Sequence, residues 1–124
     1  MYDTTGRDNQ KTQERTITQA WIETLTNGGG TFDAKTREPV SFADGYVVGI
    51  GELGRAHTHT SALLASVWPT DGLVGTWIHE GELIVDRVVY TPFDVIAREL
   101  QRISSELCVY DCKTGETIDL LAGE

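Results

Sequence analysis

Cysteine, proline and long apolar runs are scarce in this sequence of 124 residues, which holds two cysteines and three prolines. Cys108 and Cys112 fall on one predicted strand and its turn, where a rise of about 3.3 Å per residue separates their Cα atoms by ~13 Å. That separation exceeds the ~7 Å limit for a disulfide, so we expect free thiols in a reducing compartment. No apolar run approaches the ~18 residues of a membrane helix, and residues 1–15 lack a secretion signal. These absences predict an intracellular protein that does not contact membranes.

Positive charge is scarce as well. Three lysines and seven arginines oppose 19 acidic residues, which gives a net charge of −9 and a pI near 4.7. Such a surface repels phosphate backbones and anionic lipids, so we expect no direct nucleic-acid binding. Scarce lysine with abundant acid is typical of halophilic proteins, and the codon bias of a GC-rich genome explains the same composition.

The hydrophobic fraction of 40% is sufficient for the core of one domain. Residues 1–15 are polar without a period, which predicts a flexible N-terminal arm before a single domain over 16–124. Periodicity and turn residues predict four elements in the first part of that domain. They are a helix over 16–27, a strand over 46–50, a short helix over 62–68 and a hairpin over 73–91. Between the strand and the short helix, residues 51–61 are irregular. The three tryptophans are interpreted as core residues: Trp21, Trp68 and Trp77. The alternative is that one of them is exposed and anchors an interface.

The hairpin has the clearest register. A two-residue turn at Glu80-Gly81 pairs Trp77 with Ile84 on one face and Ile78 with Leu83 on the other. Both faces carry apolar residues, which predicts that this hairpin lies in the centre of a sheet.

A second helix is predicted to begin at Thr91, because a hydroxyl N-cap is followed by Pro92 and then by Asp94. Apolar residues then recur at spacings of three and four, which defines one stripe. This apolar stripe consists of Phe93, Ile96, Leu100, Ile103 and Leu107. The pairs Asp94–Arg98 and Arg102–Glu106 are expected on the solvent side of the helix.

The order of these elements groups strands together with few helices between them. This order indicates an α+β fold with a mostly antiparallel sheet built from hairpins and two main helices packed on one face. The other face of the sheet would then be free for a partner.

Two segments of the chain share a sequence pattern. Residues 31–42 and 109–120 carry Asp, Lys, Thr and Glu at the same offsets, and each follows a helical stretch. One interpretation is an internal pseudo-repeat of helix plus hairpin. The other is convergence on one turn sequence, because aspartate and threonine side chains cap such turns locally.

Residues 51–59 contain the strongest candidates for chemistry. His57 and His59 would point the same way on a strand and could share zinc or another transition metal, with His79 as a third ligand. That arrangement would suit a metal-dependent small-molecule enzyme. Alternatively, both histidines cap backbone groups in a polar loop, His79 faces Glu82 across the hairpin, and the protein has neither cofactor nor catalytic residues.

Arg55 supports a different site in the same stretch. With nearby backbone N–H groups it is the one feature suited to an anion. Arg55, His57 and His59 would then bind an anionic nucleotide within an oligomer, which would act as a nucleotide sponge.

Several short strings carry a family resemblance, namely Gly45-Tyr46-Val47-Val48, Gly75-Thr76-Trp77, residues 80–86 and Val109-Tyr110-Asp111 with its hairpin. In layout the chain resembles small uncharacterised proteins carried by viruses and mobile elements of high-GC hosts, including halophilic archaea and actinobacteria. The resemblance implies a viral or mobile-element protein in the host-cell cytoplasm or the virion. It implies no catalytic residues.

The sequence as a whole favours a non-enzymatic binding or assembly protein. It has no coherent catalytic set, a well-specified fold, a strongly acidic surface and a polar arm. Acidic proteins are steered onto basic surfaces. We therefore expect either self-association into a homo-oligomer or binding of a host protein through an acidic surface.

Overall fold

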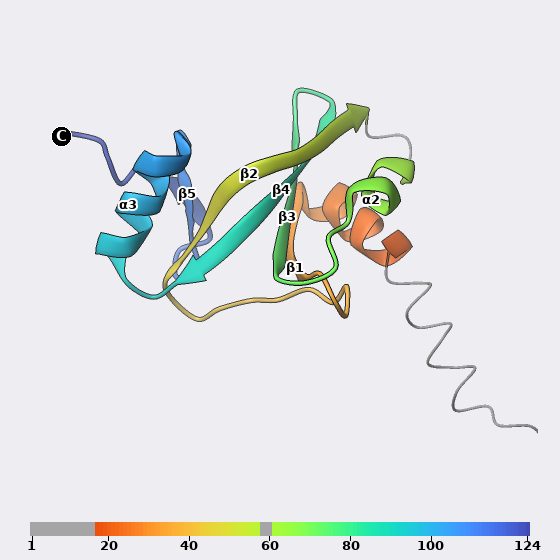
Figure 1. The fold of residues 1–124 in the computed structure, drawn as a ribbon, viewed down its shortest axis with the longest axis horizontal. Helices are drawn as coiled ribbons and strands as arrows, with labels where there is room; N and C mark the ends of the chain where they lie inside the picture. The colour runs from red at the N-terminus through yellow and green to blue at the C-terminus, as the bar shows by residue number, and fades with distance from the viewer. Residues whose placement is uncertain (1–16, 58–60) are drawn as a thin grey trace, which may run out of the picture.

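The computed structural model describes residues 17–57 and 61–124, which contain one six-stranded antiparallel sheet and helices (Figure 1). The strands are β1 Gly29–Asp33, β2 Tyr46–His57, β3 Leu73–His79, β4 Glu82–Thr91, β5 Val109–Asp111 and β6 Glu116–Ile118. The helices are α2 Ala62–Val67 and α3 Asp94–Ser104, and residues 17–27 are also helical. In space the strands follow the order β1-β3-β4-β2-β5-β6. The predicted α+β fold is confirmed, whereas the arm predicted over residues 1–15 lies outside the described residues.

The β3–β4 hairpin has the predicted register. Trp77 pairs with Ile84 and Ile78 with Leu83. Positive φ angles at Glu80 and Gly81, 51° and 81°, make the two-residue turn that matches the twist of the flanking strands. Because β4 also pairs with β2 along most of its length, the hairpin lies in the middle of the sheet as predicted.

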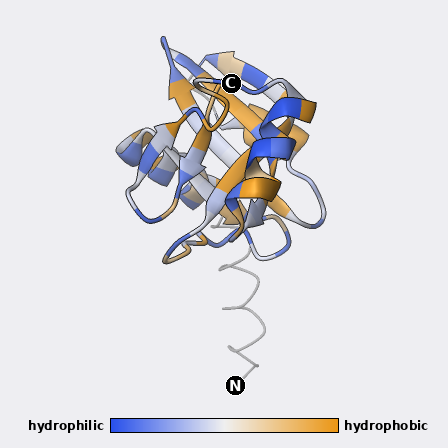
Figure 2. Ribbon diagram, turned by 90° about the vertical axis from the view of Figure 1, so that its left-hand side faces the viewer, coloured by the Kyte–Doolittle hydropathy of each residue, from blue (hydrophilic) through white to orange (hydrophobic). Residues whose placement is uncertain are grey.

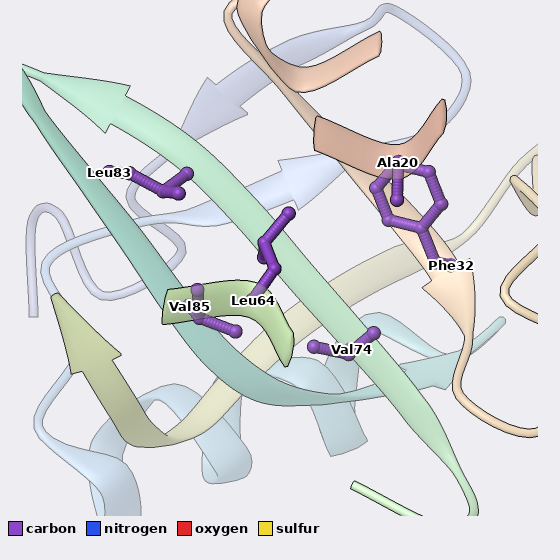
Figure 3. Packing of buried hydrophobic residues seen from close by; sticks show 6 residues of the cluster. All are labelled: Ala20, Phe32, Leu64, Val74, Leu83 and Val85. Carbon is purple, nitrogen blue, oxygen red and sulfur yellow. The ribbon is translucent and has the colours of Figure 1, made fainter. Parts of the chain in front are cut away.

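The helices pack on one face of β4. Leu83 and Val85 belong to an apolar cluster with Ala20 and Leu64 from the two N-terminal helices (Figure 3). Val89 packs against a second cluster that includes Ala97 of α3. Residues an even number of positions apart on a strand point to the same face. The opposite face, which we call the acidic face, carries Glu82, Asp86 and their neighbours on β2 and β3.

Strand β2 is longer than the sequence indicates. Residues 51–57, predicted to be irregular, continue the pairing with β4 up to His57. The register shifts between Gly49 and Gly51 and again between Glu52 and Gly54. The glycines therefore mark β-bulges, which leave an extra residue in one strand without ending it.

Helix α3 begins later than predicted, and the side of the helix that faces the sheet is not the one with most of the apolar stripe. Phe93 is its N-cap, and the Thr91 hydroxyl accepts a hydrogen bond from the Phe93 N–H at 3.2 Å. Its buried residues are Ala97 and Gln101, whereas most of the apolar stripe is exposed. Small Ala97 allows close approach to the sheet, and Gln101 finds hydrogen-bond partners in the chain after the helix. Arg102 pairs with Glu99 and Glu124 in place of the predicted Glu106.

The two copies of the repeated sequence form the same turn. In each copy the aspartate Oδ1 accepts hydrogen bonds from the N–H groups two and three residues later, at 2.8 and 3.0 Å for Asp33 and at 3.0 and 3.4 Å for Asp111. A residue with positive φ closes both turns, Arg37 at 64° and Gly115 at 76°. The shared bonds lie within the turn, so local capping explains the likeness and the pseudo-repeat stays a prediction.

The strands after the two turns differ. The return strand predicted for the first copy is reduced to a single bridge between Phe32 and Pro39, because proline has no N–H to donate to a longer ladder. In the second copy, β5 and β6 pair over three residues.

Candidate functional site: the acidic face

The predicted site residues on β2 and β3 lie in one row across the sheet. His57 of β2 and His79 of β3 are both register partners of Glu82, which lies between them on β4. The prediction that His79 faces Glu82 is confirmed. The His79 ring lies 5.0 Å from the Trp77 ring between centroids. His59, the third predicted histidine, lies outside the described residues.

No metal centre forms among residues 17–57 and 61–124, where no three His, Cys, Asp or Glu side chains come together closely enough to hold an ion. The cross-strand row of His57, Glu82 and His79 spreads its side chains over three strands. A site that includes His59 stays a prediction.

Arg55 is engaged by two carboxylates. Its Nε lies 3.1 Å from Glu52 Oε2, and its Nη1 lies 3.4 Å from Glu82 Oε1. The hydrogen bond and charge of Glu52 are the largest causes that raise the pKa of Arg55, and the bond from Arg55 lowers the pKa of Glu52. An anionic ligand at Arg55 would have to compete with both carboxylates. The nucleotide site stays a prediction without support from this geometry.

Two further carboxyl groups converge over Gly49 of β2. A Cβ atom at this glycine would lie 2.9 Å from Glu106 Oε1 and 3.8 Å from Asp86 Oδ2. Glu106 reaches this point from the segment after α3, whereas Asp86 comes from the middle of β4, in register with Glu52. The absence of a side chain at Gly49 therefore makes room for two acids side by side.

The acids of this face lack matching positive charge. Burial raises the pKa of Asp86 to about 6, with further contributions from Glu106 and Glu52 that outweigh the opposing effect of Arg55. Burial, followed by the charge of Glu52, also raises the pKa of Glu106. A cation placed here would stabilise both ionised carboxylates.

Trp77 provides an aromatic surface on the same face of the sheet. It lies in one cross-strand row with Ile84 and Arg55, and it is 43% exposed. Its interpretation as a core residue is therefore wrong, because its side of β3 is the acidic face. Trp21 and Trp68 do pack against the first apolar cluster. An exposed indole on an acidic face is a favourable environment for a guanidinium or ammonium group.

The sequence reasoning missed Asp86, Glu106 and the exposure of Trp77. The hairpin register contains part of this signal, because it places Asp86 and Trp77 on the same face as Glu82. Glu106 gives no such signal, since its approach to Gly49 depends on how α3 ends and docks.

A shallow cavity of about 350 Å³ lies elsewhere, between residue Ile17, the first turn and the end of α2. Its lining includes Lys35, Arg37 and Trp68. Because Arg55, His57 and His79 do not line it, this cavity adds nothing to the predicted site.

Comparisons of the chain with protein-family models, with curated proteins and with solved structures found no match. In the part of the chain that the structure describes, no helix is both long and apolar enough to span a membrane.

Proposed function

We propose that this chain is a non-enzymatic binding protein that recognises a basic surface of another protein through its acidic face. The observation that carries the proposal is the convergence of Asp86 and Glu106 over Gly49, on the same face of the sheet as exposed Trp77. An arginine or lysine of the partner would lie between the two carboxylates, and a second basic residue would lie against the indole. The first would gain charge-assisted hydrogen bonds and the second a cation–π contact.

The charge of the whole chain supports the same partner. A net charge of −9 attracts a basic protein over a long range and raises its association rate at low salt. Binding would also release the proton that the raised pKa of Asp86 retains below about pH 6. Affinity is therefore expected to increase as the pH rises from 5 to about 7.

We further propose that the partner is a host protein and that the chain is encoded by a virus or mobile element, as its resemblance implies. A basic host surface that normally contacts nucleic acid would be blocked by an acidic protein bound to it. This role requires a well-formed surface and no catalytic group.

An oligo-arginine peptide serves as a probe for this function. NMR titration of the labelled protein at near-physiological salt should shift the indole resonance of Trp77. The double variant Asp86→Asn/Glu106→Gln should bind the peptide at least ~10-fold more weakly, because it removes two charge-assisted contacts.

The matched control is Asp94→Asn/Glu116→Gln, which removes the same two charges from exposed positions on α3 and β6. Its peptide affinity should stay within about twofold of the unmodified protein, since exposed charges at a distance are screened. Equal weakening in both double variants, or an unshifted Trp77 resonance, would show that binding is non-specific and would refute the proposed site.

A further inference from the structure

Four of the five residues of the apolar stripe of α3 are exposed to solvent. Ile103 is 75% and Leu107 84% exposed, and Phe93 and Ile96 are exposed as well. The helix contacts the sheet through Ala97 and Gln101, which lie on a neighbouring flank. In Figure 2, which views the molecule from the α3 side, hydrophobic and hydrophilic residues alternate along this ribbon. Leu100 of the stripe packs against the second apolar cluster, and the docking of α3 leaves the other four residues of the stripe exposed.

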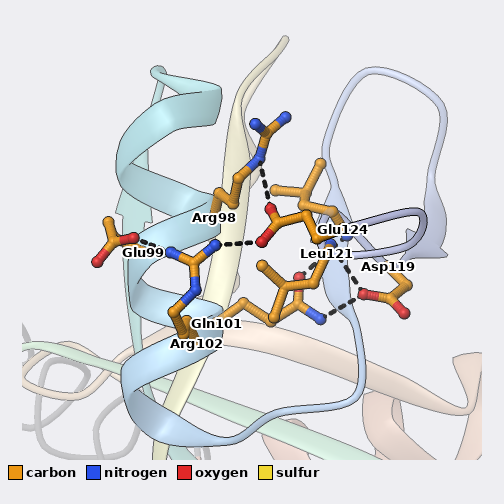
Figure 4. A network of polar contacts seen from close by, with 8 residues as sticks. Arg98, Glu99, Gln101, Arg102, Asp119, Leu121 and Glu124 are labelled. Atoms are coloured by element: carbon orange, nitrogen blue, oxygen red, sulfur yellow. Dashed lines mark hydrogen bonds and ion pairs between the residues drawn. The ribbon is translucent and has the colours of Figure 1, made fainter.

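The stripe is held rigidly at its C-terminal end. The Gln101 side chain donates hydrogen bonds from Nε2 to the carbonyl oxygens of Glu106 and Leu107, at 3.1 and 3.0 Å, and to Asp119 Oδ1 at 2.8 Å. Its Oε1 accepts a bond from the Leu120 N–H at 3.0 Å. These contacts, some of them drawn in Figure 4, fix the backbone beside Leu107. The exposure of Leu107 is therefore a property of an ordered segment.

The border of the stripe carries balanced charge. Arg102 pairs with Glu99 and Glu124, and Arg98 pairs with Glu124 at 3.7 Å (Figure 4). Within α3 itself, Asp94 and Glu99 balance the two arginines. On a chain with a net charge of −9, this helix is thus a surface where another acidic molecule can approach with little local repulsion.

We infer that the apolar stripe of α3 is a homodimer contact, in which it packs antiparallel against the same stripe of a second copy. Spacings of three and four residues are those of a seam between paired helices. A two-fold contact uses one patch twice, so a neutral apolar patch is complementary to itself. Two acids at this border, Glu99 and Glu124, are already paired with arginines, which makes the border less attractive to a basic partner than the acidic face. This inference does not depend on the proposed function, because it uses different residues.

The sequence of residues 1–15 is poor in apolar side chains that could match the stripe. Residues 1–15 contain two large apolar side chains, Met1 and Tyr2. The contact is also small, because a helix of 11 residues is about 16 Å long. We therefore expect a weak dimer at the low end of interface sizes.

Sedimentation velocity over a concentration series provides the test. The unmodified protein should shift from monomer to dimer as its concentration increases, and the dimer should tighten when salt is raised, because salt screens the repulsion between two acidic chains. Ile103→Lys should raise the dissociation constant at least ~100-fold, since the substitution occurs twice in a symmetric contact. Ile22→Lys is the matched control, because Ile22 is exposed on another helix, and it should leave the dissociation constant unchanged.

Circular dichroism of both variants checks that each remains folded, as expected for exposed positions. A monomer at every concentration and salt would overturn the inference. A dimer that persists in Ile103→Lys, or one that Ile22→Lys abolishes, would place the contact elsewhere and would overturn it as well.

Discussion

The two ends of the sheet are stabilised in different ways. At the end covered by α2 and residues 17–27, six buried apolar residues, among them Phe32 and Leu64, form one cluster (Figure 3). At the α3 end the buried cluster has three small residues, and a buried glutamine, Gln101, joins the helix to the chain that follows it. The first end uses its large apolar side chains for its own packing. The second combines a smaller apolar cluster with the hydrogen bonds of Gln101 and leaves most of the apolar stripe in solvent.

This difference separates stability from binding. A helix that buries its apolar residues contributes to folding and has little left for a partner. Helix α3 docks through Ala97 and Gln101, so its stripe remains available. The acidic face is a similar case. Gly49 has no side chain to pack, and the space above it is occupied by two carboxyl groups.

The largest loss of stability is expected at the end of the sheet that α2 covers. Leu64→Ala should reduce the free energy of unfolding by about 2–5 kcal/mol, because Leu64 is fully buried and its truncation leaves a cavity. Leu107→Ala makes the same chemical change at an exposed position and should alter stability by less than about 0.5 kcal/mol. Urea denaturation of the two variants measures both values. Similar losses would show that the contrast between the two ends is wrong.

The second-largest loss of stability is expected at the α3 end of the sheet. Gln101→Ala should reduce stability by about 2–3 kcal/mol, because the half-buried Leu120 N–H and the carbonyls of Glu106 and Leu107 lose their partner. Hydrogen exchange should accelerate most at the Leu120 amide. Unchanged exchange there would mean that Gln101 does not hold this end together.

A smaller effect comes from Asp86 and depends on pH. Because burial and neighbouring acids raise its pKa from 3.8 to about 6, the folded state retains the proton more tightly than the unfolded chain. Stability therefore falls as the pH rises from 3.8 to 6 and then levels off. Asp86→Asn should be more stable than the unmodified protein above pH 6, by about 1 kcal/mol after solvent screening, with no advantage below pH 3.8. Thermal melts across this range would contradict the account if the difference were constant.

The smallest effect should be equal at the two edges of the sheet. Asp33→Ala and Asp111→Ala each remove the side-chain acceptor of the same turn and should each cost about 0.5–1 kcal/mol. Denaturation curves compare them directly. A much larger loss for one of them would show that its turn has a role beyond local capping.

The sequence predicts local features well and distant contacts poorly. The β3–β4 register follows from Glu80-Gly81, and both repeated turns follow from their aspartates, because these contacts lie within a few residues. The apolar stripe of α3 is also visible in the sequence. The exposure of the stripe cannot be predicted from the sequence. It arises because Gln101 is buried in its place, and the hydrogen-bond partners that allow this include the distant residues Asp119 and Leu120.

The same limit applies to the candidate site. The glycines of β2 lead to the prediction of a loop, because glycine is common both at β-bulges and at the end of a strand. The meeting of Glu106 with Asp86 over Gly49 requires the docked position of α3, which no local pattern encodes. Of the predicted site residues, the structure brings His57 and His79 into one row and pairs Arg55 with acids.

Titration of four proteins with the oligo-arginine peptide, followed by calorimetry, tests the central claim most directly. The proteins are the unmodified chain, Asp86→Asn/Glu106→Gln, Asp94→Asn/Glu116→Gln and Ile103→Lys. The account predicts that the first double variant alone loses at least ~10-fold in affinity, because only its substitutions change the acidic face. Equal affinity in all four, or an equal loss in both double variants, would contradict a binding site at Asp86 and Glu106.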